Sequence, residues 1–283
     1  MRALLLIIAL IVLLCGCTED RPVGPKGAQH FSLETDPQLS PDGDHIYYAS
    51  HDSFLTSNSG IYRASVSMPI RIKLVSGVGL SSPTVSPDDH TLAYLDSGKI
   101  KWIDLLSLST GTFPSLSEWK SIVFVDTAVL IASREDFLEM ITLSPPAAGG
   151  LGVGFDPDDL GDSTYLFSIH PEPELRAILS ENYWNGEKDT FLIGAFSGSL
   201  GPIRSPSKHP SNNHVVFSIH NGTNFDIYSA RGDTLTLLGT SNRPGVEIVS
   251  DGLVLFTGQT GLLYNTTVYG GTPQPWLHIE DSD

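Results

Sequence analysis

A motif that recurs about every forty residues constrains the fold of this 283-residue chain more than any other feature. Its clearest copy, Asp36–Ser50, contains the turn Ser40-Pro41-Asp42-Gly43, and a second copy runs over Pro83–Leu95. Weaker copies lie around positions 125, 171, 210 and 250, which with 41 and 87 give intervals of 38 to 46 residues. Six similar units therefore fill the chain after residue 27, as in proteins built from repeated blades.

Each unit predicts four short strands. Ser-Pro-Asp-Gly is typical of a type I turn, because Pro presets φ at the second position and Gly accepts the fourth. The turn joins two antiparallel strands, and segments such as Gly60–Ala64 and Arg71–Val75 predict a third and a fourth. The sequence thus predicts an all-β fold, a six-bladed β-propeller of four-stranded antiparallel blades over residues 28–283. A sandwich or jelly roll would not explain the recurring turn.

These residues resemble the WD40-like (PD40) repeat of the propeller domain of TolB and its relatives. The matching residues are Ser40–Gly43, Ile46–Ser50, Gly60-Ile61-Tyr62 and Asn224–Tyr228. The resemblance implies a six-bladed propeller. TolB itself also has an N-terminal α/β domain and no lipid anchor, so the resemblance does not carry over its partners. Either Phe31–Leu33 or Pro275–Ile279 is expected to complete the blade that joins the two ends of the ring.

The N-terminal segment reads as an export signal. Arg2 precedes the apolar run Ala3–Leu14, which is shorter than the roughly 20 residues of a membrane-spanning helix. Leu14-Cys15-Gly16-Cys17 resembles a bacterial lipobox, which implies cleavage before Cys17 and lipidation of its thiol. Residues 1–16 are then a lipoprotein signal peptide and residues 17–27 the lipidated cysteine with a flexible tether. An uncleaved N-terminal anchor is the alternative.

The lipobox resemblance also implies a location. Several acyl chains on one cysteine hold a protein stably at a bilayer. Thr18 stands where an Asp would favour retention at the inner membrane. We therefore expect an exported protein anchored to the outer membrane, with its propeller in the periplasm or at the surface.

The composition of the chain restricts the classes of partner and of chemistry that are expected. The formal net charge of −16 argues against nucleic acid, whose binders present basic surfaces. Cys17 is the only cysteine after the proposed cleavage site, so no disulfide is expected. Common catalytic motifs such as Gly-x-Ser-x-Gly and His-Glu-x-x-His are absent from the sequence. We expect a monomeric propeller that is not an enzyme and has no cofactor. Its expected partners are envelope proteins.

The best candidate contact patch is Asn182, Tyr183, Trp184 and Asn185, joined by Phe54 from another long loop. Amphipathic aromatic residues beside amides suit protein surfaces. The patch is expected on the face that carries the connections between second and third strands, together with a long crossing at Gly149–Ser163. The alternative is that Tyr183 and Trp184 fold back as a lid on their own blade.

Histidines and acids suggest weaker possibilities. No bound metal is expected, but His170 and His209 each precede a Pro and both are predicted to end innermost strands near the channel. They give the alternative function, a lyase or hydrolase on polysaccharide or peptide with a channel site or metal. His45, His90 and His214 are expected to face solvent. Asp156–Asp162 fails the calcium-loop pattern and is expected to be an acidic solvated loop.

Overall fold

The computed structural model describes residues 32–53, 55–67, 70–115, 117–161, 163–171, 175–195, 201–208, 213–250 and 252–276. The predicted signal peptide, the tether with Cys17, and the candidate residues Phe54 and His209 lie outside the described residues.

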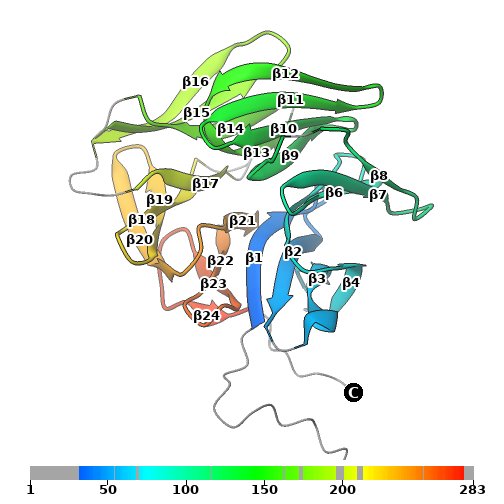
Figure 1. The fold of residues 1–283 in the computed structure, drawn as a ribbon. Coiled ribbons are helices and arrows are strands. Elements are labelled where there is room, and N and C mark those ends of the chain that lie inside the picture. The colour runs from blue at the N-terminus through cyan, green and yellow to red at the C-terminus, as the bar shows by residue number, and fades with distance from the viewer. Residues whose placement is uncertain are drawn as a thin grey trace, which may run out of the picture. The chain divides into compact units, whose positions relative to one another are not determined.

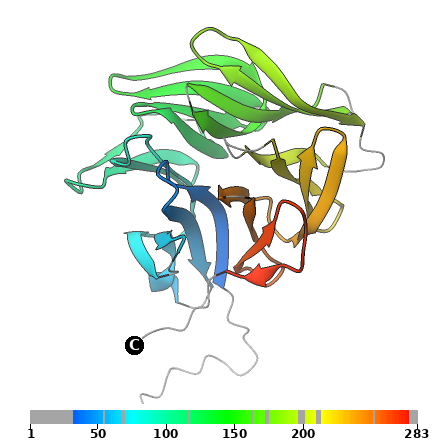
Figure 2. The same cartoon turned by 180° about the vertical axis from the view of Figure 1, so that it is seen from behind.

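The described chain forms six four-stranded antiparallel sheets arranged around an axis (Figures 1 and 2). Blades 1 to 3 consist of β1 (Ser32–Leu39), β2 (His45–Asp52), β3 (Gly60–Ser65) and β4 (Arg71–Ser76); β5 (Leu80–Val85), β6 (Thr91–Asp96), β7 (Lys99–Asp104) and β8 (Thr110–Thr112); and β9 (Ser121–Asp126), β10 (Val129–Arg134), β11 (Phe137–Leu143) and β12 (Pro146–Val153). Blades 4 to 6 consist of β13 (Phe155–Gly161), β14 (Thr164–Ile169), β15 (Leu175–Asn182) and β16 (Lys188–Ala195); β17 (Ile203–Lys208), β18 (Val215–His220), β19 (Phe225–Arg231) and β20 (Thr234–Ser241); and β21 (Val246–Ser250), β22 (Leu253–Thr257), β23 (Leu263–Thr267) and β24 (Gln274–Pro275). The predicted six-bladed propeller is confirmed.

The core lies between blades rather than within one. The second strand of each blade is buried on both sides, as in Thr91–Asp96, where four consecutive residues are inaccessible. One cluster joins Tyr47 and Ile61 of blade 1 to Leu92 and Tyr94 of blade 2. Each sheet buries its two faces against its neighbours, so the ring is the smallest unit that closes the core. Outermost strands such as β12 remain largely exposed.

The recurring turn has the expected local structure. The Ser40 hydroxyl donates to Asp42 (2.5 Å) and accepts from the His45 backbone N–H (2.9 Å), while Gly43 has a φ of +78°. The second copy repeats these contacts: Ser86 donates to Asp88 (2.5 Å) and accepts from the Thr91 N–H (2.9 Å). The motif therefore pins the connection between the first and second strands of its blade.

Blade 4 departs from the predicted spacing. Its first turn is at Gly161–Ser163, where both residues have positive φ, and not at Pro171, which lies between β14 and β15. The prediction of a long connection over Gly149–Ser163 is also wrong. Strands β12 and β13 occupy most of that range, and only Gly154 separates them. The expected solvated loop Asp156–Asp162 is also wrong, because Asp156 to Gly161 belong to β13, the innermost strand, and form part of the channel wall; Asp162 lies outside the described residues. In this blade His170-Pro171 resembles the turn motif but lies at the connection between the second and third strands, so the predicted register is shifted by one strand.

The ring closes without a shared blade. Phe31 lies outside the described residues, but Ser32 and Leu33 belong to the innermost strand of blade 1, not to an outer strand. Pro275 belongs to the outer strand of blade 6, so each end completes its own blade. Closure depends on contacts across the seam, where Glu34 donates its backbone N–H to Gly261 O (2.6 Å) and accepts from the Thr257 hydroxyl (2.6 Å).

Candidate binding site

The propeller has two faces, which we name by their connections. The turn face carries the connections from first to second and from third to fourth strands. The crossing face carries the connections from second to third strands and those between blades. Because β15 and β16 are third and fourth strands, the Asn182–Glu187 turn lies on the turn face. The expectation that placed Tyr183 and Trp184 on the opposite face is therefore wrong.

The crossing-face end of the channel is built from repeated bulges. In blades 1, 2, 4 and 5 the innermost strand is interrupted by a residue of positive φ followed by proline: Asp36-Pro37, Ser82-Pro83, Asp156-Pro157 and Ser205-Pro206. Proline has no backbone N–H to donate to the sheet. It is tolerated at such bulges because the extra residue there makes no ladder hydrogen bond. Each bulge turns backbone and side chain toward the channel, where these residues line a cavity of about 110 Å³.

The same hydrogen bond joins the bulges of adjacent blades in two places, between blades 1 and 2 and between blades 4 and 5. Asp36 accepts from the Ser82 backbone N–H, and Asp156 accepts from the Ser205 N–H, each at 3.1 Å. Arg204 also pairs with Asp156 (2.8 Å). Burial raises the pKa of Asp36, and the charge of Asp156 adds to that increase. The recurring Asp-Pro and Ser-Pro pairs, placed three or four residues before each turn copy, were the sequence signal for this cluster and were not recognised.

Two buried carboxyl groups lie midway along the channel. Gln38, Asp158 and Glu247 line both channel cavities, and Gln38 donates to Asp158 (3.4 Å). Glu247 accepts from the Leu39 N–H (3.4 Å), across the seam between blades 6 and 1. Burial raises the pKa of Asp158 to about 7, and the nearby charge of Asp159 acts in the same direction. Burial and the charge of Asp158 likewise raise the pKa of Glu247 well above its ordinary value.

The channel opens on the turn face through a larger cavity of about 450 Å³, which we call the mouth cavity. This volume lies within the range of cavities that hold ligands. Its wall combines apolar side chains with carboxylates and is formed by blades 1 to 4 and 6. The lining includes Leu39, Val85, Val123, Val125, Leu160 and the carboxylates Asp126, Asp158, Asp159 and Glu247.

Of the predicted patch, Tyr183 bonds to residues that line this cavity. The Tyr183 hydroxyl donates to Asp126 of blade 3 (3.0 Å), and the Tyr183 backbone N–H bonds to Ser163 O (3.1 Å); both partners line the mouth cavity. The ring of Trp184 packs on that of Tyr183 with centroids 4.9 Å apart and is 73% exposed. The alternative, a lid on their own blade, is met only in part: Tyr183 folds back onto blade 4 and also onto blade 3, whereas Trp184 is presented to solvent.

The two asparagines support the turn. Asn182 Oδ1 accepts from the backbone N–H groups of Trp184 (3.0 Å) and Asn185 (3.2 Å). Asn185 Oδ1 accepts from the Glu187 N–H (2.8 Å). Such local bonds fix the turn conformation and hold Trp184 outward. The structure therefore gives Asn182 and Asn185 a positioning role in addition to their predicted membership of the patch.

The predicted histidine site at the channel is not formed by His170. This residue follows the second strand of blade 4 on the crossing face, where its ring lies 5.0 Å from that of Phe155. Burial and the charges of Arg176 and Arg204 lower its pKa to about 4. The described residues contain no group of three or more His, Cys, Asp or Glu side chains placed to hold a metal.

The other histidine expectation holds only in part. His90 is exposed and lies 3.6 Å from Asp88. His45 is half-buried. His214 is buried, with Nδ1 3.0 Å from the Ser229 hydroxyl and its ring against Tyr269, so it does not face solvent.

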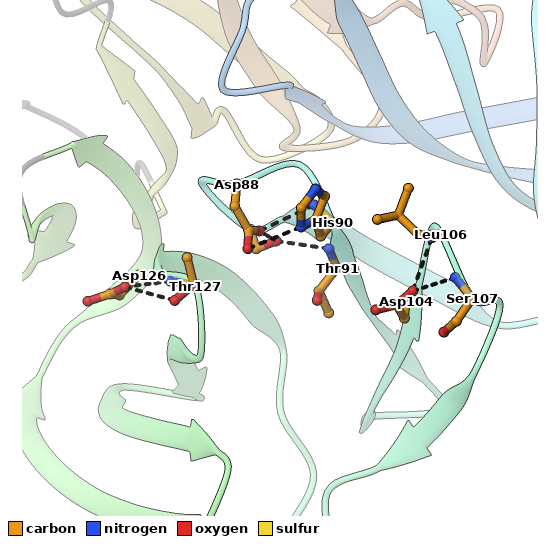
Figure 3. Close-up of polar contacts among 9 residues, drawn as sticks. Asp88, His90, Thr91, Asp104, Leu106, Ser107, Asp126 and Thr127 are labelled. Atoms are coloured by element: carbon orange, nitrogen blue, oxygen red, sulfur yellow. Dashed lines mark hydrogen bonds and ion pairs between the residues drawn. The ribbon is translucent and has the colours of Figure 1, made fainter.

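Several carboxylates of the turn face accept hydrogen bonds from residues of the same turn, which lowers their pKa values. Figure 3 shows Asp88, Asp104 and Asp126 with the N–H and hydroxyl groups that bond to them. The Ser86 hydroxyl lowers the pKa of Asp88, and backbone N–H groups of Ser107 and Thr127 lower those of Asp104 and Asp126. The Ser40 hydroxyl does the same for Asp42. These groups therefore remain negative well below neutral pH.

Within the part of the chain that the structure describes, no helix is long and apolar enough to span a membrane.

Comparison with known proteins identifies the fold. No family model matches the chain, and no curated protein matches it. Among solved structures it is similar to TolB from Acinetobacter baumannii, with 17% identity and a TM-score of 0.55 over 77% of this chain and 56% of that one. It therefore spans little more than half of that TolB. The chain has a TolB-like six-bladed propeller fold.

Two similar structures come from enzymes. An oligogalacturonate lyase in complex with manganese has 16% identity and a TM-score of 0.53, over 87% of this chain and 78% of that one. The propeller domain of the Trilobed protease from Pyrococcus furiosus, described as having an open velcro topology, has 12% identity and a TM-score of 0.54, over 89% and 97%. At these identities the likeness establishes the fold and leaves function to the chain's own residues.

Proposed function

We propose that this protein is a bacterial envelope lipoprotein whose propeller is a non-enzymatic protein-binding module and uses the turn face. The lipobox at Leu14–Cys17 supports attachment to a membrane through Cys17. The observation that carries the binding assignment is Trp184, which is 73% exposed and packs on Tyr183, a residue bonded to the wall of the mouth cavity through Asp126. Tryptophan is among the residues enriched at the positions that carry most of the binding energy in protein interfaces.

The enzymatic alternative, a lyase or hydrolase acting on polysaccharide or peptide, draws support from the two enzymes with the same architecture. Its proposed residues do not support it, because His170 lies outside the channel wall and has a pKa lowered to about 4. Metal analysis of the purified full-length protein separates the two assignments. Stoichiometric metal that is lost in His170→Ala would favour the enzyme.

Replacing Trp184 by alanine tests the binding assignment. We expect recovery of crosslinked envelope proteins by the tagged full chain to fall by about 30-fold, as for a residue at the centre of an interface. The free energy of unfolding should change by less than about 0.5 kcal/mol, because the side chain is mostly exposed.

Phe137→Ala is the matched control, since Phe137 is also an exposed aromatic residue but lies on the crossing face. Equal recovery with wild type, Trp184→Ala and Phe137→Ala would contradict the assignment. Lipid attachment is tested separately: labelled fatty acid should be incorporated into wild type and not into Cys17→Ser.

A further inference from the structure

We propose that the mouth cavity binds a lysine- or arginine-rich segment of a protein partner. This inference rests on the proposed function, because it specifies the chemistry of the partner that the turn face would bind.

The first observation is an apolar floor next to an exposed aromatic side chain. The half-buried Leu39 and Leu160 line the mouth cavity, and the exposed Trp184 packs on Tyr183, whose hydroxyl donates to Asp126 in the cavity wall. Such a surface accepts the aliphatic stems of long side chains, which bury their methylene groups while the charged end stays in a polar environment. An exposed Trp also attracts a cation held over its ring.

The second observation is the charge of the lining. Four carboxyl groups line the cavity, namely Asp126, Asp158, Asp159 and Glu247, and no Lys, Arg or His is among its described lining residues. The crossing-face end differs, because Lys120 and Arg204 stand there beside Asp36 and Asp156. The cations offset part of the negative charge at the crossing-face end, whereas no cation does so among the lining residues of the turn-face end, which is therefore the more complementary to a cationic group.

The third observation is the surrounding turn face. Asp88 and Asp104 on blade 2 and Asp126 on blade 3 lie on turns of this face (Figure 3), as does Asp42 on blade 1. The pKa values of all four are lowered. One cation of this face, Lys188, pairs with Glu181 (3.0 Å). Complementary charge of this kind steers association and selects the partner. A segment with several cationic side chains matches both the rim and the cavity.

The buried pair Asp158 and Glu247 adds selectivity for a cation over a neutral group. Without a ligand their charged forms are opposed by burial, to which the charge of Asp159 adds for Asp158 and the charge of Asp158 adds for Glu247. A cation in the cavity offsets both effects and favours ionisation. A neutral or acidic segment would leave these carboxyl groups as they are or meet repulsion at the rim.

The test uses the full-length protein in detergent and three labelled peptides of equal length, in which the same positions are Lys, Gln or Glu. We expect the Lys peptide to bind at least about tenfold more tightly than the Gln peptide, a difference of about 1.4 kcal/mol. Raising salt from about 0.05 M to about 0.5 M should weaken binding of the Lys peptide, because the rim charges are screened. Binding of the Gln peptide should change little.

Asp126→Asn/Asp159→Asn should remove most of the preference for the Lys peptide. The matched control is Asp136→Asn, an exposed acid on the crossing face, which should leave the preference unchanged. Equal binding of the three peptides, no binding of any of them, or an unchanged preference in the double variant would overturn the inference. If crosslinking through Trp184 still recovers a partner in that case, the proposed function stands and only the partner's chemistry is wrong.

Discussion

Replacing Leu263 by alanine is expected to lower the free energy of unfolding by about 3 kcal/mol, within the range found for buried leucines. Leu263 is fully inaccessible and lies in the cluster that joins blade 6 to blade 1, with Tyr48 and Leu255. Because neither terminal strand crosses the seam, this cluster is the main apolar contact that closes the ring. No strand is shared between blades 6 and 1 that could fill the cavity left by the substitution.

Leu237→Ala is the matched control, because Leu237 is 55% exposed on the outer strand of blade 5 and should change stability by less than about 0.5 kcal/mol. Urea unfolding of both variants at one pH measures the difference. A loss for Leu263→Ala no larger than that for Leu237→Ala would show that the ring does not depend on this seam.

Replacing Glu34 by glutamine is expected to flatten the dependence of stability on pH. Glu34 is buried at the seam, accepts from the Leu263 N–H (3.0 Å) and lies 3.9 Å from Arg71. Burial raises its pKa from 4.5 to about 7, and its bond to Leu263 and the charge of Arg71 only partly offset this. The folded state therefore binds the proton more tightly than the unfolded state does.

Protonation of Glu34 therefore stabilises the folded state, and stability decreases as the pH rises and the proton is lost. The proton's contribution to stability is fully present below about pH 4.5 and is lost as the pH rises through about 7. A shift of this size corresponds to about 3 kcal/mol. Glutamine keeps an acceptor for Leu263 without a charge, so the variant should gain on wild type by about that amount between about pH 5 and pH 8.

Comparing the variant with wild type isolates Glu34, because Asp36, Asp158 and Glu247 also have raised pKa values and remain in both proteins. Glu135→Gln, an exposed acid on the crossing face, should leave the pH profile unchanged. Parallel profiles for wild type and Glu34→Gln would show that the seam carboxyl group does not titrate in this range.

The sequence predicted the architecture because the same local turn chemistry occurs in several units. Ser40-Pro41-Asp42-Gly43 and Ser86-Pro87-Asp88-Asp89 form the same bonded turn, and their spacing sets the blade size. Blade 4 was misplaced because Gly161 and Ser163 form its turn without that motif. A histidine followed by proline at His170 imitated the motif one connection later.

The channel was harder to predict than the blades. Asp36, Asp158 and Glu247 are far apart in sequence and meet only because six innermost strands surround one axis. Asp156 looked solvated because it belongs to an acidic stretch with proline and glycine, yet a bulge turns it into the channel wall. The aromatic residues beside amides in a long loop predict Trp184 as a contact residue, but its predicted face is wrong because β15 is the third strand of blade 4 and not the second.

A photo-reactive amino acid placed at position 184 or at position 137 of the full-length protein tests the central claim most directly. Both positions carry exposed aromatic residues, on the turn face and the crossing face respectively. We expect illumination of bacteria to yield a discrete crosslinked protein from position 184 and none from position 137. A product from position 137 alone, or identical products from both, would contradict the assignment of the turn face as the binding surface.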